Sequence, residues 1–385
     1  MAAARSMAAA RSATAGLALV LCALGVLSPM ATSPASAAQR AHDAAAATTQ
    51  GAHARHRERR RVHAQRAPSV VVSMASWRLP NGLSRAGAAP LPNGHVLLLA
   101  GLLGSGASSA DVGVLDTATG RLTSIATLPS PTHDAGSAEL DGRAFLFGGG
   151  QSVPFALVQG VTIPRSLGPG TAVSATVTGQ LPQLRADDEA VTVGRAAYVV
   201  GGYDGSIGDA AVLETANGST FSTFVTLPVA VRYPAVTAAN GVIYVFGGEA
   251  EQGGTTSEFS TPAGSTTPPP GQQVAVVQEI DTRTHTARVV GSLPHALQGA
   301  AAFDLGGHIY LAGGDSYPPG SAPVSGSTVW SFDPSTVSFR VAGHLAAPVS
   351  YAAVAVEHRV AWLIGGERNG VPVASAQRVR LRAIR

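Results

Sequence analysis

A unit of about fifty residues recurs six times along the 385-residue chain. Each copy starts near a Leu-Pro pair or its remnant, continues through a stretch of small residues, and reaches an apolar run that ends on two glycines. The pairs are Gly148-Gly149, Gly201-Gly202, Gly247-Gly248, Gly313-Gly314 and Gly365-Gly366, and Ala100-Gly101 takes this place in the first copy. A period of this length predicts a propeller, a solenoid or another repeat array.

The composition of each copy predicts four β-strands. The apolar runs are short and rich in β-branched and aromatic residues, as in AYVVGG, VIYVFGG, HIYLAGG and VAWLIGG, which is typical of strands. A polar loop follows each glycine pair, and the next strand ends in an acidic turn such as LDTATG or EIDTRT. Asp, Thr and Gly favour such turns because the side chains bond to their own backbone. A fourth strand then leads to the next Leu-Pro.

These repeats resemble those of secreted bacterial kelch-repeat β-propeller proteins, over residues 69–385. The resemblance implies an all-β fold, a six-bladed kelch-type β-propeller with four-stranded blades around a central channel. The segment SVVVSMASWRLP, at 69–80, has no blade before it, and the C-terminal SAQRVRLRAIR has no fourth strand after it. We expect these two strands to pair in the last blade, which closes the ring and removes an open sheet edge.

The first 38 residues predict a signal peptide. Arg5 and Arg11 precede the apolar stretch AGLALVLCALGVL, and an Ala-x-Ala sequence follows at 35–37, the pattern of a secretory signal. An uncleaved membrane anchor is the alternative, and it would be the only membrane contact we expect. The single cysteine, Cys22, lies in this stretch. The localisation expected from it is secreted or associated with the cell envelope.

Residues 39–68 read as a disordered, basic linker rich in His and Arg. Nine of the 26 basic residues precede residue 67, against two of the 23 acidic ones, so the repeats keep 17 basic and 21 acidic residues and a net charge of −4. The run at 57–61, RERRR, fits an acidic cell-wall polymer, lipid headgroups or nucleic acid, but a solvated spacer is the simpler interpretation. No specific nucleic-acid recognition is expected.

Propeller geometry predicts one candidate site. The Leu-Pro loops and the loops after the glycine pairs lie on the same face when four antiparallel strands build each blade. Five residues stand fifteen positions before the first member of a pair: Arg85, His133, Arg232, Gln298 and Ser350. Arg185 stands sixteen positions before its pair, and Gln151 follows the pair at 148–149. The predicted ligand-binding residues at this mouth are Arg85, His133, Arg185, Arg232, Tyr203, Asp204, Glu249, Asp315 and Glu367.

Two interpretations of this mouth stay open. In the first, the arginines bind a carboxylate or another anion through their planar guanidinium groups, and Tyr203, Tyr233 and Tyr351 stack on the ligand or bond to it. In the second, each arginine pairs with a carboxylate of a neighbouring blade and only ties the rim together.

Other chemistry is sparse in the sequence. Asp187, Asp188 and Glu189 form a carboxylate cluster that would suit calcium or a solvated strand start, and adjacent strand residues point to opposite sides. Some kelch propellers resemble galactose oxidase, whose copper site needs a cysteine, but none follows Cys22. No metal and no cofactor is expected. The long loop at 249–273 is interpreted as a lid, a docking arm or a tolerated insertion.

Two functions fit this pattern of residues. We expect a monomeric extracytoplasmic binding module that holds an envelope protein or a glycan at the mouth, rather than an enzyme. The alternative is a carbohydrate-active kelch enzyme similar to the sialic-acid mutarotases, in which rim arginines and a carboxylate such as Glu249 would orient an acidic sugar and move a proton.

Overall fold

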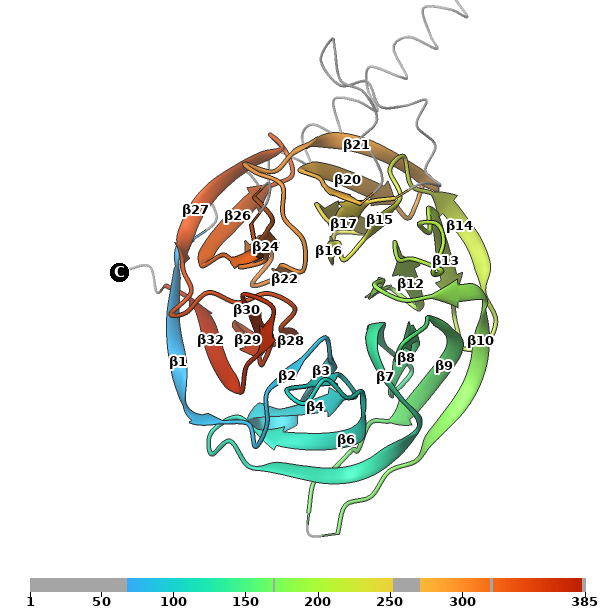
Figure 1. The fold of residues 1–385 in the computed structure, drawn as a ribbon, viewed down its shortest axis with the longest axis vertical. Coiled ribbons are helices and arrows are strands. Elements are labelled where there is room, and N and C mark those ends of the chain that lie inside the picture. The colour runs from blue at the N-terminus through green and yellow to red at the C-terminus, as the bar shows by residue number, and fades with distance from the viewer. Residues whose placement is uncertain (1–67, 169, 252–270, 319–320, 383–385) are drawn as a thin grey trace, which may run out of the picture. The chain divides into compact units, whose positions relative to one another are not determined.

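The computed structural model describes residues 68–168, 170–251, 271–318 and 321–382 (Figure 1). The signal peptide predicted for 1–38, the linker predicted for 39–68 except its last residue, and most of the loop at 249–273 lie outside the described residues. Within the described part of the chain, no helix is long and apolar enough to span a membrane.

The described residues form β-strands and one short 3-10 helix, Pro92–Gly94. Three four-stranded antiparallel sheets follow the order in which their strands occur in the chain. These sheets are β11 (Glu189–Val193), β12 (Ala196–Val200), β13 (Ala211–Thr215) and β14 (Ser222–Thr226); β16 (Ala235–Ala239), β17 (Val242–Phe246), β20 (Val276–Asp281) and β21 (Thr286–Ser292); and β22 (Ala301–Asp304), β23 (Ile309–Ala312), β26 (Thr328–Asp333) and β27 (Ser338–His344).

A seven-stranded sheet combines the first two repeats. The sequence predicts a break at the Leu-Pro pair around Pro129, but β7 runs through this proline over 19 residues and pairs with β6 on one part and β8 on the other. Its strands are β3 (Gly87–Leu91), β4 (His95–Leu99), β6 (Ser109–Asp116), β7 (Leu122–Leu140), β8 (Arg143–Gly150), β9 (Phe155–Thr162) and β10 (Ala175–Arg185).

The two ends of the repeat region meet in one sheet. It has the order β1 (Val70–Arg78), β32 (Ser375–Leu381), β29 (Val360–Ile364) and β28 (Ala353–Glu357). β1 is antiparallel to β32, with Val70 opposite Leu381 and Val72 opposite Val379. The pairing of these two strands is the one that the sequence predicts.

Short strand pairs extend the loops that follow the glycine pairs. They are β2 (Leu83–Ser84) with β5 (Leu102–Leu103); β15 (Val231–Arg232) with β18 (Glu249–Ala250) and β19 (Gln272–Gln273); β24 (Asp315–Ser316) with β25 (Val324–Ser325); and β30 (Glu367–Arg368) with β31 (Val371–Pro372).

The hydrophobic core lies between neighbouring sheets. Ile243 and Val245 of β17 pack in one buried cluster with Val200 of β12, whereas Tyr244 and Phe246 pack in another with Ile309 and Leu311 of β23. Successive side chains of a strand point to opposite faces, so a fully apolar strand contacts two neighbours at once. Figure 1 shows the sheets around a common centre, with β3, β16, β22 and β28 close to it. This arrangement is propeller-like.

The glycine pairs allow adjacent sheets to approach each other. Gly247 has a φ of 59°, and a Cβ at this position would lie 2.4 Å from the carbonyl oxygen of Leu297. The next residue, Gly248, donates its backbone N–H to that same oxygen at 2.8 Å. Only glycine combines this backbone conformation with so close an approach.

Candidate functional site

Six residues, one from each repeat, form a closed cycle of backbone hydrogen bonds at the centre of the sheets. The N–H of each member donates to the carbonyl oxygen of the member before it, over 2.7 to 3.3 Å, and the N–H of the first donates to the last at 3.0 Å. The members, in order, are Arg85, Asp134, Asp187, Tyr233, Gly299 and Tyr351.

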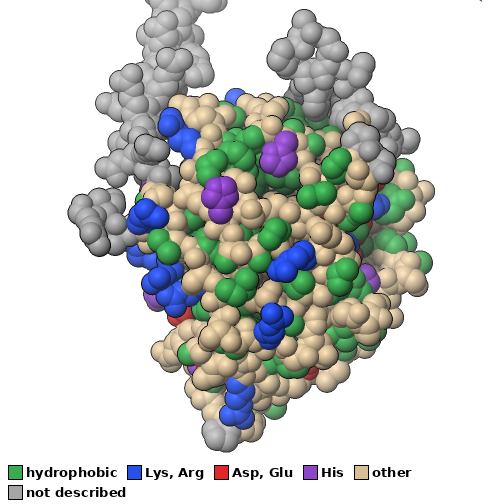
Figure 2. All heavy atoms as spheres, turned by 60° about the vertical axis from the view of Figure 1, so that its left-hand side comes forward, with side chains coloured by type: hydrophobic (Ala, Val, Ile, Leu, Met, Phe, Trp, Pro, Cys, Tyr) green, Lys and Arg blue, Asp and Glu red, His purple; other side chains and the backbone are tan. Residues whose placement is uncertain are grey.

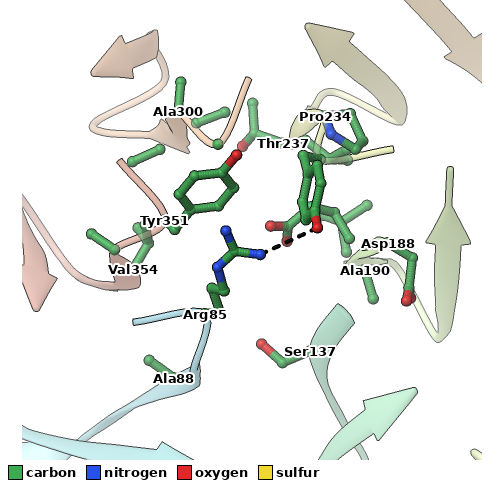
Figure 3. Close-up of a pocket in the computed structure, with 18 of the residues that line it drawn as sticks. Arg85, Ala88, Ser137, Asp188, Ala190, Pro234, Thr237, Ala300, Tyr351 and Val354 are labelled. Atoms are coloured by element: carbon green, nitrogen blue, oxygen red, sulfur yellow. Dashed lines mark hydrogen bonds between the residues drawn. The ribbon is translucent and has the colours of Figure 1, made fainter. Parts of the chain in front are cut away.

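All six members have a left-handed backbone, with φ between 49° and 62°. This conformation is unfavourable for residues other than glycine, and such strained positions are concentrated at functional sites. All six also line one central cavity of about 370 Å³. In Figure 3, Arg85 and Tyr351 lie at its centre.

The cycle corrects the predicted register by one residue. Its last five members stand fourteen positions before the first glycine of each pair, not fifteen. The residues at fifteen pair instead with the strand after the glycines, as Arg232 does with Glu249 and Ser350 with Glu367. The prediction missed Asp134, and it named Asp187 only as part of an acidic cluster. A search for polar residues one position later in each repeat would have found both.

Arg85 is held by hydrogen bonds on several sides. Its Nε donates to Glu367 Oε1 at 2.6 Å, and its Nη1 donates to both oxygens of Asp134 at 3.1 and 3.0 Å and to the Tyr233 hydroxyl at 3.2 Å. Its guanidinium carbon lies 4.2 Å from the centre of the Tyr351 ring. Burial disfavours its charge, but Asp134 and Glu367 raise the pKa of Arg85 above its usual value. These contacts of Arg85 are the ones that the rim-tying interpretation predicts.

Arg232 is held much more loosely. Its Nε lies 3.6 Å from Asp187 Oδ2 and 3.8 Å from Glu249 Oε2, and its Nη1 lies 3.7 Å from Glu251 Oε1. These distances exceed a hydrogen bond, and the buried Nε has no hydrogen-bond partner. The guanidinium carbon lies 5.0 Å from the ring centres of both Tyr203 and Tyr233. The Arg232 guanidinium therefore lies among carboxylates and aromatic rings, and its Nε–H donates no hydrogen bond.

A second cavity, the mouth pocket, lies next to Arg232. It has a volume of about 720 Å³, and its lining includes Arg232, Glu249, Gln273, Gln298 and Tyr317. Gln298 is 4% exposed, and its Nε2 donates to the Tyr351 hydroxyl at 2.6 Å, while its Oε1 has no hydrogen-bond partner. Two residues that line the mouth pocket thus each carry a buried polar atom without a hydrogen-bond partner, Arg232 Nε and Gln298 Oε1.

Six predicted site residues line neither cavity, and four of these six are bonded away from Arg85 and Arg232. Arg185 is fully buried, donates to the carbonyl oxygens of Gly201 and Ala211, and lies 3.2 Å from Asp209. Asp315 is also fully buried and accepts from the Ser325 hydroxyl at 2.7 Å. The remaining two are Asp204, which accepts from two backbone N–H groups of its own turn, and His133, whose Nδ1 lies 2.8 Å from the Ser108 hydroxyl.

The other predicted residues lie at the mouth. Glu249 lines the mouth pocket, Tyr203 lies beside Arg232, and Glu367 is bound to Arg85 and to the Ser84 hydroxyl. The structure therefore brings Arg85, Arg232 and these three together.

Burial lowers the pKa of His133, so this imidazole is neutral near pH 7.

Asp187, Asp188 and Glu189 are all among the residues around the central cavity. The Asp188 carboxylate is turned away from Arg85 in Figure 3, and the nearby charge of Arg185 opposes the effect of burial on its pKa. Burial, and next the charge of Asp134, raise the pKa of Asp187 to about 7. Asp188 is 4% exposed, and burial raises its pKa as well. Across the described ranges, no three His, Cys, Asp or Glu side chains are grouped so that they could hold a metal ion.

By sequence, the chain matches no family model and no curated protein. Its structure is similar to a solved structure of YjhT, with a TM-score of 0.61 and 17% sequence identity. The similarity covers 78% of this chain and 95% of that one. At this identity, the comparison shows the fold alone: an all-β, propeller-like arrangement of antiparallel sheets.

Proposed function

We propose that residues 69–385 form a six-bladed, kelch-type β-propeller that β1 closes in the last blade. The six-membered backbone cycle supports this proposal, because each repeat contributes one member and the last bonds to the first. The pairing of β1 with β32 and the likeness to YjhT support it too. We further propose a monomeric, secreted or envelope-associated protein, on the basis of the signal-like sequence at 1–38 and the basic segment that follows.

We infer that the propeller is a binding module, and that its mouth pocket takes a small polar ligand with an anionic group, such as an acidic sugar of an envelope glycan or glycoprotein. One observation carries this inference: Arg232 keeps its charge in the mouth without a hydrogen bond at Nε. A carboxylate would accept the bonds that its guanidinium can donate.

Other groups in the mouth fit the same ligand. Gln298 Oε1 would accept from a hydroxyl or an N–H group next to the anion, since this buried oxygen has no partner. Tyr317 is 45% exposed and Tyr233 also lines the pocket, so aromatic faces are available for the apolar side of a sugar ring. Few precisely placed polar groups and aromatic walls are usual in ligand pockets.

The test compares two arginine variants of the full chain. Arg232→Ala should abolish binding of an acidic sugar, measured by calorimetry or as a ligand-induced rise in melting temperature. Arg195→Ala is the matched control, because Arg195 is exposed in the turn between β11 and β12 and lines neither cavity. If Arg232→Ala and Arg195→Ala bind each sugar, neutral or acidic, with equal affinity, Arg232 is not part of the binding site.

A second candidate function is a mutarotase-type sugar epimerase. Asp187 favours it, since its pKa of about 7 suits proton transfer at neutral pH and its Oδ2 lies 3.6 Å from Arg232 Nε. Asp187 would donate a proton to the ring oxygen, and Glu249 would accept one from the anomeric hydroxyl. NMR of anomer exchange would test this: Asp187→Asn should slow exchange to the uncatalysed rate while binding persists. Binding without any accelerated exchange by the wild-type chain would exclude the epimerase.

A further inference from the structure

The charge of the repeat region is unevenly distributed along the chain. Residues 83–339 have nine arginines and 19 acidic residues, whereas residues 69–82 and 340–385 together have eight arginines and two acidic residues. This second group includes every strand of the terminal sheet, the sheet formed by β1, β28, β29 and β32. One of its two acidic residues, Glu367, is already bonded to Arg85. Such an asymmetry of charge within one domain indicates a charged partner.

Three arginines alternate along β32 and the residue that follows it, namely Arg378, Arg380 and Arg382. Side chains two residues apart on a strand point to the same face, about 6.6 Å from each other. The strand pairing continues to Arg382, whose backbone N–H donates to the Ser69 carbonyl oxygen at 2.8 Å. The neighbouring β1 has no acidic residue that could pair with this row.

None of these three arginines has an ion pair among the described residues. The ion pairs that described arginines make with carboxylates involve Arg85, Arg185, Arg232, Arg283 and Arg288. Arg380 and Arg382 are exposed, and Arg378 is half-buried with a buried Nε that has no hydrogen-bond partner. The three guanidinium groups can therefore donate to an external anion, which they bind through parallel hydrogen bonds.

Further arginines extend the positive charge over the outside of the sheets. Arg78 at the end of β1 and Arg340 of the neighbouring β27 are exposed, and within the described ranges neither has an ion pair. Figure 1 places β1, β27 and β32 on one side, and Figure 2 brings this side forward. Arginine side chains are spread across it, and little carboxylate is visible. A positive surface of this extent suits a long anionic partner better than a small ion.

A linear phosphodiester polymer complements this surface. Each arginine that neutralises a phosphate of such a polymer releases counterions, so a row of arginines gains affinity with every contact. A nucleic acid would add bases, which sites for single strands hold on exposed aromatic side chains. β32 has no aromatic residue, and the one aromatic residue of β1, Trp77, donates its indole N–H to the Thr117 carbonyl oxygen at 2.9 Å and packs 5.9 Å from the Trp362 ring. The surface therefore favours a phosphate backbone without bases.

We propose that the outside of the terminal sheet binds a linear phosphodiester polymer without bases, a poly(glycerol phosphate) of the cell envelope, through Arg378, Arg380 and Arg382. The segment that precedes β1 in the sequence, with RERRR at 57–61 and Arg66, has the same charge and favours the same class of partner. None of the three arginines lines the central cavity or the mouth pocket, so this surface is separate from the ligand site proposed above. The choice of an envelope polymer rests on the extracytoplasmic location proposed above.

Calorimetric titration of the full chain with synthetic poly(glycerol phosphate), repeated at several salt concentrations, tests the proposal. Arg380→Gln combined with Arg382→Gln removes two exposed charges, so this double variant should fold. We expect its Kd to rise about tenfold at low salt. The slope of log K against log salt should become shallower by about 1.4, because each lost phosphate contact contributes about 0.7.

A second double variant is the matched control. Arg165→Gln combined with Arg195→Gln removes the same charge from two exposed arginines outside the terminal sheet, neither of which has an ion pair in the part of the chain that the structure describes. This control should change Kd and the salt slope little, as should Arg232→Ala in the mouth pocket. Equal losses in the two double variants, or an unchanged Kd in the Arg380 and Arg382 variant, would overturn the proposal. Tighter binding of oligothymidylate than of poly(glycerol phosphate) at equal charge would overturn the choice of polymer.

Discussion

Replacing Arg85 by methionine should strongly destabilise the fold. The change keeps much of the apolar stem but removes the guanidinium that joins Asp134 to Glu367. The side chains of these two carboxylates are only 10% and 5% exposed, so neither is well hydrated once the cation is gone. Both then keep their charge without a cationic partner, although Glu367 still accepts from the Ser84 hydroxyl.

The size of the effect follows from this burial. Removing one partner of a buried ion pair costs about 3–5 kcal/mol, because the remaining charge stays desolvated. The Arg85 side chain is 18% exposed, so water screens part of the charge. We therefore expect a loss near the lower limit, about 3 kcal/mol in the free energy of unfolding.

Urea unfolding followed by circular dichroism would measure this loss at pH 7. Arg283→Met is the matched control: Arg283 lies 3.7 Å from Asp281, and the two side chains are 78% and 22% exposed. An exposed pair contributes about 1 kcal/mol or less. The reasoning is refuted if Arg85→Met loses no more than Arg283→Met does. The difference between Arg85→Met and wild type should also narrow at pH 4, where acid protonates the unpaired carboxylates.

Three further perturbations test the description of the fold and the site. The pKa of Asp187 is raised to about 7 in the folded state, against about 3.9 in the unfolded state. The contribution of Asp187 to the free energy of unfolding therefore falls as pH rises from 4 to 7. In denaturant titrations at pH 8, Asp187→Asn should be more stable than wild type by up to about 4 kcal/mol. Gly247→Ala should lower the free energy of unfolding by more than about 2 kcal/mol, because the added Cβ would meet the Leu297 carbonyl oxygen. Gly142 also has a positive φ, 73°, but nothing lies within 4 Å of an added Cβ, so Gly142→Ala should cost about 1 kcal/mol. Similar losses for the two variants in chemical unfolding would contradict the close-approach argument. Val70→Ala, in a buried position of β1 that packs with the last sheets, should lower stability by about 1–3 kcal/mol, and an unchanged melting temperature would mean that β1 does not hold this sheet.

The sequence predicted the strands well because their signal is local. Apolar runs such as VIYVFGG became β17 and the glycine pair after it, and the pairing of β1 with β32 followed from one unmatched strand at each end. At Pro129 the chain stays extended within β7, but its sheet pairing breaks there: the register with β6 shifts between Thr127 and Thr132, and β8 is the partner from His133 on. Proline fits this stretch because its missing N–H is not required by a neighbouring strand.

The site was predicted less well, because a strand has a period of two. An error of one residue turns a side chain to the other face. For this reason Ser350 was expected beside the channel, where Tyr351 lies, and His133 was expected where Asp134 lies. The burial of Arg185 depends on Asp209, which comes from a later strand connection of the same repeat. No local spacing indicates that contact.

The backbone cycle holds the six repeats together through peptide groups, and this leaves the side chains of its members available to contact a ligand. Every bond in it joins a peptide N–H to a peptide carbonyl oxygen, so the cycle depends on the side chains of its members only through the strain of their left-handed backbone. Six attachment points are thus fixed at one level around an axis, and here they display Arg, Asp, Asp, Tyr, Gly and Tyr. A different set of side chains on the same frame would recognise a different ligand, which makes this ring a natural starting point for redesigning specificity without rebuilding the scaffold.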